Sequence, residues 1–367
     1  MMARSRILGV PMMVAALAAA GCSDSTAPLA DFDPARAQAD VAAMTTLMQG
    51  DQLAAFTAMS GYFDLSGAPL AAVSSARQLL SSSSPASPET SRRVAVAAVE
   101  GFSLRTAAGS TPSLATLPPE VFGTTFTFDP GSNTYVPSDR TGAPANGVRF
   151  IIYAVDPITN VPIVGTEVGH ADLIDTSAGS ELGAGLRLIV VGGSTTYLDY
   201  AFLASGTTNS TILQVDGFVS DGSTMLNFGI DATVAIVEEE LSVDLDFSFA
   251  IPSRQFSVTA SLDGLVGSSA SLGEITLTIV SAGAHVRFEI AEDESTLNAT
   301  VYVNNRIFAT VTGDPADPTV LGAGGNELTA EEIAALSNLL RVAEASFEFF
   351  SFLMAPVYSA TGGINVP

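Results

Sequence analysis

The strongest constraint on the fold is a strict alternation of apolar and polar residues in the second half of the chain. Between 226 and 236, and again between 241 and 251, every second residue is apolar, and most of the residues between them are Ser, Thr, Asn, Asp or Gly. In an extended strand, successive side chains point to opposite faces of the sheet. Both segments are therefore predicted to be strands with one apolar and one polar face. The same pattern predicts further strands over 256–262, 275–279, 286–290, 297–303 and 307–311.

The links between these segments are short, as at Asp221-Gly222, Pro252-Ser253, Gly283-Ala284 and Asn304-Asn305. Parallel neighbours need a crossover of about a dozen residues, so short links predict antiparallel neighbours. Earlier segments add a hairpin over 125–136 and strands over 148–155, 161–168 and 171–176. We expect an α+β, mainly β fold. In it, residues 120–313 form a large antiparallel meander sheet that is open, half-barrel or barrel-like.

A long C-terminal helix over 327–356 is predicted to cover the apolar face of that sheet. Thr329 and Glu332 form a capping box at its start, and Leu328 with Ile333 fits the flanking hydrophobic staple. Apolar side chains then recur at helical spacing and spread nearly all round in the last turns. A helix that is apolar on all sides is usually buried.

The region over 35–119 is Ala-rich and is expected to be helical or mixed. Met44, Leu47 and Met48 lie at three- and four-residue spacing, which is typical of a helix. We expect these N-terminal helices, the meander and the C-terminal helix to belong to one domain over 35–367.

The first 22 residues have the order of a bacterial export signal. Two Arg and no acid come first, then an apolar run too short to span a bilayer, then Ala19-Ala20-Gly21-Cys22. This resembles the lipobox of bacterial lipoproteins. The resemblance implies that residues 1–21 are removed, that Cys22 becomes a lipid anchor carrying fatty acyl groups such as palmitate, and that 22–34 is a tether. It also implies the bacterial cell envelope, and Ser23 after the Cys favours the outer membrane.

Charge and composition exclude several classes of function. The 14 basic residues are all Arg, against 38 acidic residues, so Schiff-base lysine chemistry and the P-loop are absent. Loss of Arg4 and Arg6 with the signal would change the net charge from -24 to -24 minus 2, or -26. Such a chain repels phosphate backbones, so we expect no nucleic-acid partner. A single Cys rules out an internal disulfide framework, and we expect no cofactor.

The turns of a meander alternate between two ends of the sheet, which groups charged residues that lie far apart in sequence. Clustered carboxylates are the ligands that Ca²⁺ prefers. One end is predicted to hold the weak metal candidates Glu238, Glu239, Glu240, Glu292, Asp293 and Glu294. The other is predicted to hold Arg254, His285 and Arg306. The acidic spacing matches no EF-hand loop, and solvated turn charge explains it as well. We therefore predict no metal site.

Catalytic patterns are weak. His170 lies beside Glu167 and Asp172, which would suit a general base, but a polar strand-edge histidine is the simpler interpretation. No G-x-S-x-G elbow occurs. Tyr153, Arg149 and Asp156 are predicted to form a structural polar cluster near a turn. We expect no enzymatic activity.

A broad sheet with one apolar face and helices that can lie against it is similar in plan to half-barrel lipoprotein carriers of the LolA and LppX type. The similarity is architectural and no motif carries it. It implies a membrane-anchored, non-catalytic envelope lipoprotein that binds or carries an apolar or lipid ligand between sheet and helices. The alternative is a structural or interaction lipoprotein at the cell surface without a small-molecule ligand. A transmembrane β-barrel would alternate in the same way, but the chain has no Trp and no aromatic girdles at strand ends.

Overall fold

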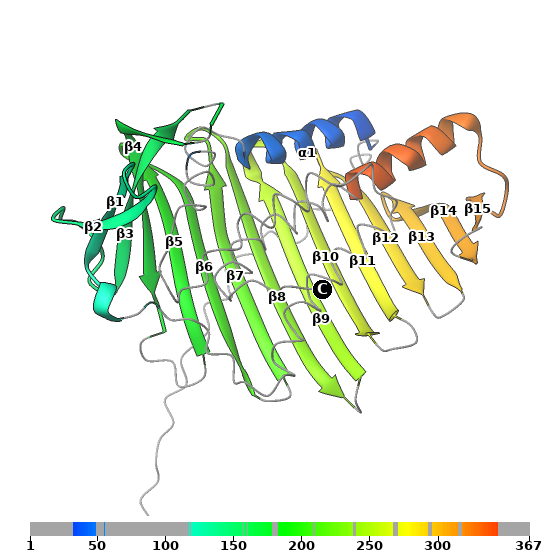
Figure 1. Cartoon of the computed structure of the whole chain (residues 1–367). Coiled ribbons are helices and arrows are strands. Elements are labelled where there is room, and N and C mark those ends of the chain that lie inside the picture. The colour runs from blue at the N-terminus through cyan, green and yellow to red at the C-terminus, as the bar shows by residue number, and fades with distance from the viewer. Residues whose placement is uncertain are drawn as a thin grey trace, which may run out of the picture.

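The protein is built around one very broad β-sheet (Figure 1). The computed structural model describes residues 32–48, 55, 117, 119–156, 158–159, 161–177, 183–207, 210–237, 240–266, 271–292, 296–314 and 318–343. Fifteen strands follow the order β15-β14-β13-β12-β11-β10-β9-β8-β7-β6-β5-β4-β3-β1-β2. β15 and β2 are the edges of this linear order, so these strands form an open sheet.

The strands are mostly long and follow one another directly. Their bounds are β1 Thr124–Asp129, β2 Thr134–Ser138, β3 Gly147–Val155, β4 Pro162–Asp175, β5 Gly183–Gly192, β6 Thr195–Thr207, β7 Ser210–Ser220, β8 Met225–Val237, β9 Glu240–Ile251, β10 Phe256–Val266, β11 Ser271–Ser281, β12 Ala284–Glu292, β13 Leu297–Val303, β14 Arg306–Gly313 and β15 Thr319–Gly322. Short 3-10 turns are formed by η2 Pro119–Val121 and η3 Pro252–Arg254. The predicted mainly β fold with a large antiparallel meander is confirmed.

Three details differ from the sequence prediction. β1 pairs with β3 in parallel, because β2 is the edge strand and the chain returns past β1 to form β3. β5, β6 and β7 lie within the predicted meander, in a region where no individual strand segments were assigned. The two strands predicted over 161–176 are one strand, β4, which continues through Gly169. A Cβ at Gly169 would lie 2.0 Å from the carbonyl oxygen of Val191, so the glycine permits close contact with β5 rather than ending the strand.

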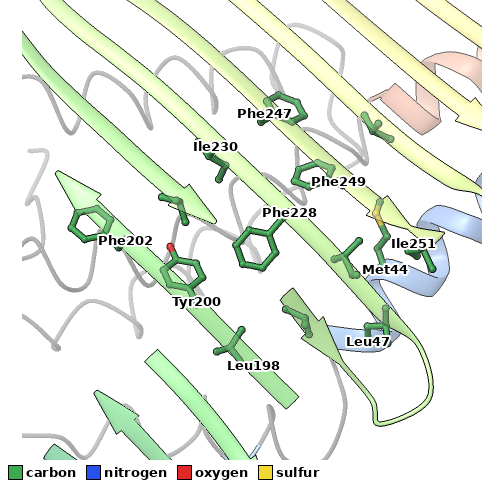
Figure 2. Close-up of a cluster of buried hydrophobic side chains, with 14 of the residues drawn as sticks. Met44, Leu47, Leu198, Tyr200, Phe202, Phe228, Ile230, Phe247, Phe249 and Ile251 are labelled. Carbon is green, nitrogen blue, oxygen red and sulfur yellow. The ribbon is translucent and has the colours of Figure 1, made fainter. Parts of the chain in front are cut away.

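The alternating residues divide the sheet into a buried apolar face and an open polar face. On β8, Leu226, Phe228 and Ile230 are at most 5 % exposed, and on β9 Phe247 and Phe249 are 3 % and 1 % exposed. Figure 2 shows that these side chains and those of β6 gather in one cluster with residues of an N-terminal helix. Burying each such side chain contributes about 1.5–3 kcal/mol before chain entropy is subtracted. The apolar face is the core of the molecule.

The N-terminal helix α1, Pro34–Met48, lies across one end of the strands (Figure 1). The Asp33 carboxylate caps it by accepting hydrogen bonds from the backbone N–H groups of Ala35 and Arg36, at 3.0 and 3.2 Å. Met44 and Leu47 are buried against the sheet, as their spacing predicted.

A polar clamp fixes the position of α1. The buried Asp40 carboxylate accepts hydrogen bonds from Arg254 Nε at 2.6 Å and from Ser281 Oγ at 3.1 Å. Arg254 follows β9 and Ser281 ends β11, so one side chain of α1 joins two separate turns of the sheet. This clamp gives the helix a direction that apolar contacts alone do not supply.

A second helix covers the same face over residues 330–343. Its capping box is present: Thr329 Oγ1 accepts from the Glu332 N–H, and the Glu332 carboxylate accepts from the Thr329 N–H. Leu336, Leu339 and Val342 belong to the buried core, whereas Ile333 of the predicted staple is 53 % exposed. The C-terminal helix therefore lies against the apolar face as predicted, and its predicted continuation over 344–356 lies outside the described residues.

The two helices also touch each other, because Gln38 Nε2 donates to Asn338 Oδ1 at 3.3 Å. Neither described helix has the length and apolarity that a membrane crossing requires. Residues 1–31, which include the predicted signal, Cys22 and most of the tether, lie outside the described part of the chain.

Candidate binding surface on the polar face

The polar face carries two different charge patterns. In the half formed by β3 to β6, arginines pair with carboxylates of the neighbouring strand. Arg149 on β3 faces Asp172 on β4, and the guanidinium donates from Nε and Nη2 to the two carboxylate oxygens, each at 2.6 Å. Arg187 on β5 makes the same two-point contact with Asp199 on β6. Bidentate pairs of this kind fix both side chains in one geometry.

His170 lies at the edge of the Arg149–Asp172 pair. Its Nε2 is 3.8 Å from Asp172 Oδ2. Burial lowers the pKa of His170 and the nearby Arg149 lowers it further, while Asp172 acts in the opposite direction. Because the ordinary histidine pKa is about 6.5, His170 is neutral at pH 7. As a neutral side chain it lies beside the Arg149–Asp172 ion pair without adding a charge to it.

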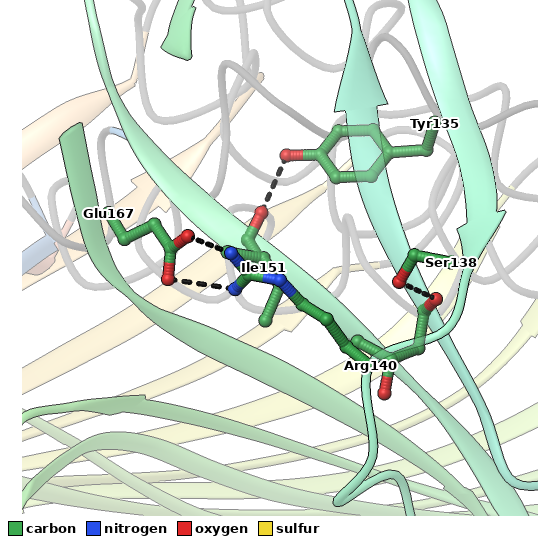
Figure 3. A network of polar contacts seen from close by, with 6 residues as sticks. Tyr135, Ser138, Arg140, Ile151 and Glu167 are labelled. Atoms are coloured by element: carbon green, nitrogen blue, oxygen red, sulfur yellow. Dashed lines mark hydrogen bonds and ion pairs between the residues drawn. The ribbon is translucent and has the colours of Figure 1, made fainter. Parts of the chain in front are cut away.

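The predicted cluster of Tyr153, Arg149 and Asp156 does not form. A register shift between Ile152 and Tyr153 turns Tyr153 to the buried side, and burial together with Glu167 raises the pKa of its hydroxyl. Figure 3 shows the ion pair of Arg140 with Glu167 at this place, beside the hydrogen bond from Tyr135 Oη to the Ile151 carbonyl at 2.8 Å. A β-bulge changes the direction in which the side chains of its strand point. The shift between Ile152 and Tyr153 therefore separates Tyr153 from Arg149 and Asp156.

The half formed by β8 to β11 has carboxylates opposite carboxylates. Asp231 faces Asp246, Asp244 faces Asp263, and Asp263 faces Glu274 on the next strand. All five are exposed, and the sequence has no basic residue between Arg187 and Arg254 or between Arg254 and Arg287. Burial, Asp246 and Asp263 together raise the pKa of Asp244. Like charges at opposed positions of a sheet destabilise it, so this half of the face is held by something other than its polar contacts.

A hollow of about 350 Å³ lies on this acidic half. Apart from Phe247, its lining consists of small, hydroxyl and carboxylate residues: Gly229, Asp231, Asp246, Ser248, Thr259, Ala260, Ser261, Thr276 and Thr278. Gly229 leaves room at its floor, since a Cβ there would lie 3.3 Å from Ser248 Oγ. The hollow offers hydrogen-bond acceptors and negative charge on a surface open to water.

Two of the weak metal candidates, Glu240 and Glu292, belong to described strands, and these strands do not bring their backbones together. Glu240 begins β9 and Glu292 ends β12, so β10 and β11 separate them. Three strand spacings amount to about 14 Å between their backbones, too far for a shared ion. Glu238, Glu239, Asp293 and Glu294 lie outside the described residues. Within the part of the chain that is described, no three His, Cys, Asp or Glu residues could hold a metal ion.

Comparison with known proteins gives no relative for this chain: no family model, no curated protein and no solved structure matches it. The opposed acidic pairs were not predicted from the sequence as a site. Their signal was present in the polar positions Asp244 and Asp246, but the partner across the sheet depends on register, which the pattern alone does not give.

Proposed function

We propose that this protein is a non-catalytic, lipid-anchored envelope protein that binds an apolar ligand between the apolar face of its sheet and the helices over it. The single observation that carries the proposal is the continuous apolar core from β6 to β12, with α1 and the helix over 330–343 seated on it. The lipobox resemblance around Cys22 supports the anchor.

The way α1 is held supports exchange with a ligand. The largest described side chains that α1 buries in the core are Val41, Met44 and Leu47; Ala37 is buried with them, and the clamp at Asp40 adds a polar contact. Removing those three side chains from the core would cost about 5–9 kcal/mol. An acyl chain of about 16 carbons regains about 0.8 kcal/mol for each buried CH₂ group, or about 12 kcal/mol. An acyl ligand could therefore replace α1 on the apolar face.

Lipid analysis of purified protein tests this function. The chain carrying Cys22→Ser, exported behind a standard secretory signal and purified without detergent, should release about one lipid per protein on solvent extraction. Ala232→Trp, which fills a buried position of β8, should abolish this lipid, and Thr233→Trp on the polar face should not. Circular dichroism would verify that both variants fold. Protein that is free of lipid in every preparation would contradict ligand binding.

The acidic half of the polar face favours a second candidate, an interaction lipoprotein that uses its open surface. The observation behind it is the exposed hollow lined by Asp231 and Asp246. In that case Asp231→Asn with Asp246→Asn would reduce retention of the protein by envelope fractions, while the amount of bound lipid would not change.

A further inference from the structure

One end of the sheet carries α1, and we call it the α1 end. The register of antiparallel neighbours brings every second turn to this end. These turns follow β3, β5, β7, β9, β11 and β13. The Asp40 clamp attaches α1 there, through Arg254 and Ser281.

Exposed large apolar side chains gather at the α1 end. Of the nine in the described residues, five lie at or beside its turns: Ile158, Ile163, Val164, Met225 and Ile307. The other four are Leu203, Ile212, Val320 and Ile333. Single exposed apolar residues are ordinary on protein surfaces, but five along one rim are a pattern. From β4 to β14 the rim spans ten strand spacings, or about 48 Å, which suits a broad, flat partner.

The β3–β4 hairpin continues beyond the pairing of β4 with β5. β4 pairs with β5 only from His170 onward, whereas Pro162, Glu167 and Gly169 of its first half pair with β3. Ile163 and Val164 lie in this first half of β4 and are 42 % and 52 % exposed. Ile158 at the tip is 89 % exposed.

Hydrogen bonds from one carboxylate organise the described residues of the tip. The Asp156 carboxylate accepts hydrogen bonds from the backbone N–H groups of Ile158 and Thr159 at 2.8 and 2.9 Å, which closes the turn. The Arg140–Glu167 ion pair holds the base of the extended segment (Figure 3). A preformed apolar tip pays little ordering entropy when it is inserted into another apolar medium.

The anchor in the proposed function joins the molecule at the same end. α1 begins at Pro34, which is 34 minus 22, or 12, residues after Cys22. Twelve residues span at most about 40–43 Å, which is no more than the length of strands such as β8, with 13 residues. The α1 end is therefore the end that a lipidated Cys22 would hold nearest to a bilayer.

We propose that the α1 end is a membrane-apposed surface, and that the β3–β4 tip formed by Ile158, Ile163 and Val164 inserts into the headgroup region of a phospholipid bilayer. The inference rests on the lipid anchor of the proposed function. Both signs of charge occur at this end, because Arg254 and Arg306 lie at the turns after β9 and β13, and Asp156 and Asp221 lie at the turns after β3 and β7. Insertion is therefore driven by the apolar side chains and does not need anionic lipid.

The composition of the chain makes a direct test simple, since it has no Trp and one Cys. The mature chain beginning at Cys22 would be coupled through that thiol to a maleimide phospholipid in phosphatidylcholine vesicles that contain brominated lipid, a contact quencher of Trp fluorescence. Ile158→Trp should lose about half of its emission or more, with a shift to shorter wavelength, as expected for an interfacial side chain. Leu203→Trp, on the polar face away from this end, is the matched control and should be unaffected.

Adding Ile163→Ser with Val164→Ser to the Ile158→Trp chain should reduce the quenching by about half, because less apolar area is inserted. Equal quenching in the Ile158→Trp and Leu203→Trp chains, or none in either, would overturn the inference. Chemical coupling makes this result independent of lipidation in the cell. Failure of the proposed anchor is measured separately, as wild-type protein that incorporates no labelled palmitate at Cys22.

Discussion

The two halves of the polar face hold similar strands with opposite electrostatics. Between β3 and β6, the carboxylates of Asp172 and Asp199 each meet an arginine. Between β8 and β11, carboxylates meet carboxylates and the strands still pair without a break. The difference shows that polar contacts do not determine the register of the acidic half. A one-residue slip would bring Phe247 and Phe249 to the water side, and this penalty fixes the register despite the repulsion.

The largest loss of stability is expected at the Asp40–Arg254 pair, because Asp40 is the most buried carboxylate among the described ion pairs. Asp40 is 2 % exposed and its partner Arg254 is 40 % exposed. Arg254→Gln leaves a buried carboxylate without its counter-charge, so the free energy of unfolding should fall by about 3 kcal/mol. Chemical denaturation at neutral pH measures this loss.

Asp40→Asn is the matched variant for the same pair. It leaves Arg254 partly exposed to water, so it should cost less than Arg254→Gln. The double variant should recover part of the loss, since the buried charge and its partner are removed together. Additive losses from the two substitutions would show that the clamp does not act as a pair.

Within the arginine-paired half, the loss of stability when a carboxylate is removed should increase with the burial of its ion pair. Asp172 is 12 % exposed and pairs with Arg149 at 22 %, whereas Arg187 in the outer pair is 46 % exposed. Asp172→Asn should therefore cost about 1.5–3 kcal/mol. Asp199→Asn should cost about 0.2–1 kcal/mol. Thermal and urea unfolding of the two variants would compare them, and an equal cost would refute the dependence on burial.

The fold was largely predictable because its strongest signal is local. Alternation in β8 and β9 comes from single residues, and it needs no knowledge of their partners. The same reasoning missed β5, where Leu188-Ile189-Val190-Val191 is an unbroken apolar run without a two-residue period. Gly169 falls between the two strands predicted over 161–168 and 171–176, and in the structure it lets β5 approach the continuous strand β4.

The charged surface was less predictable because cross-strand partners depend on register and bulges. Arg149 was assigned to Tyr153 and Asp156, its near neighbours in sequence, but it faces Asp172 across the β3–β4 pair. The Asp40 clamp joins residues more than 200 positions apart, and no periodicity carries that information. Both cases need the folded register before a partner can be named.

The acidic half gives the smallest expected change in the free energy of unfolding. There, removing a carboxylate should stabilise the protein rather than destabilise it. The raised pKa of Asp244 means that the folded chain binds its proton more tightly than the unfolded chain does. Its favourable contribution is thus present below the ordinary aspartate pKa of about 3.9 and is lost as the pH rises through the raised folded value. At neutral pH, Asp244→Asn should be more stable than wild type by about 0.2–1 kcal/mol, and the gap should close as the pH falls toward 4.

Glu167→Gln is the control from the other half. Arg140 lowers the pKa of Glu167 through their hydrogen bond, so its contribution is present at neutral pH and is lost as the pH falls through the lowered folded value. Glu167→Gln should therefore be less stable than wild type at pH 7, and this difference should also close in acid. Denaturation curves of the three proteins at several pH values would measure these differences. At neutral pH, Asp244→Asn should be more stable than wild type and Glu167→Gln less stable. If Asp244→Asn also fell below wild type at neutral pH, the opposed carboxylates would be stabilising the sheet, and the contrast between the two halves would be wrong.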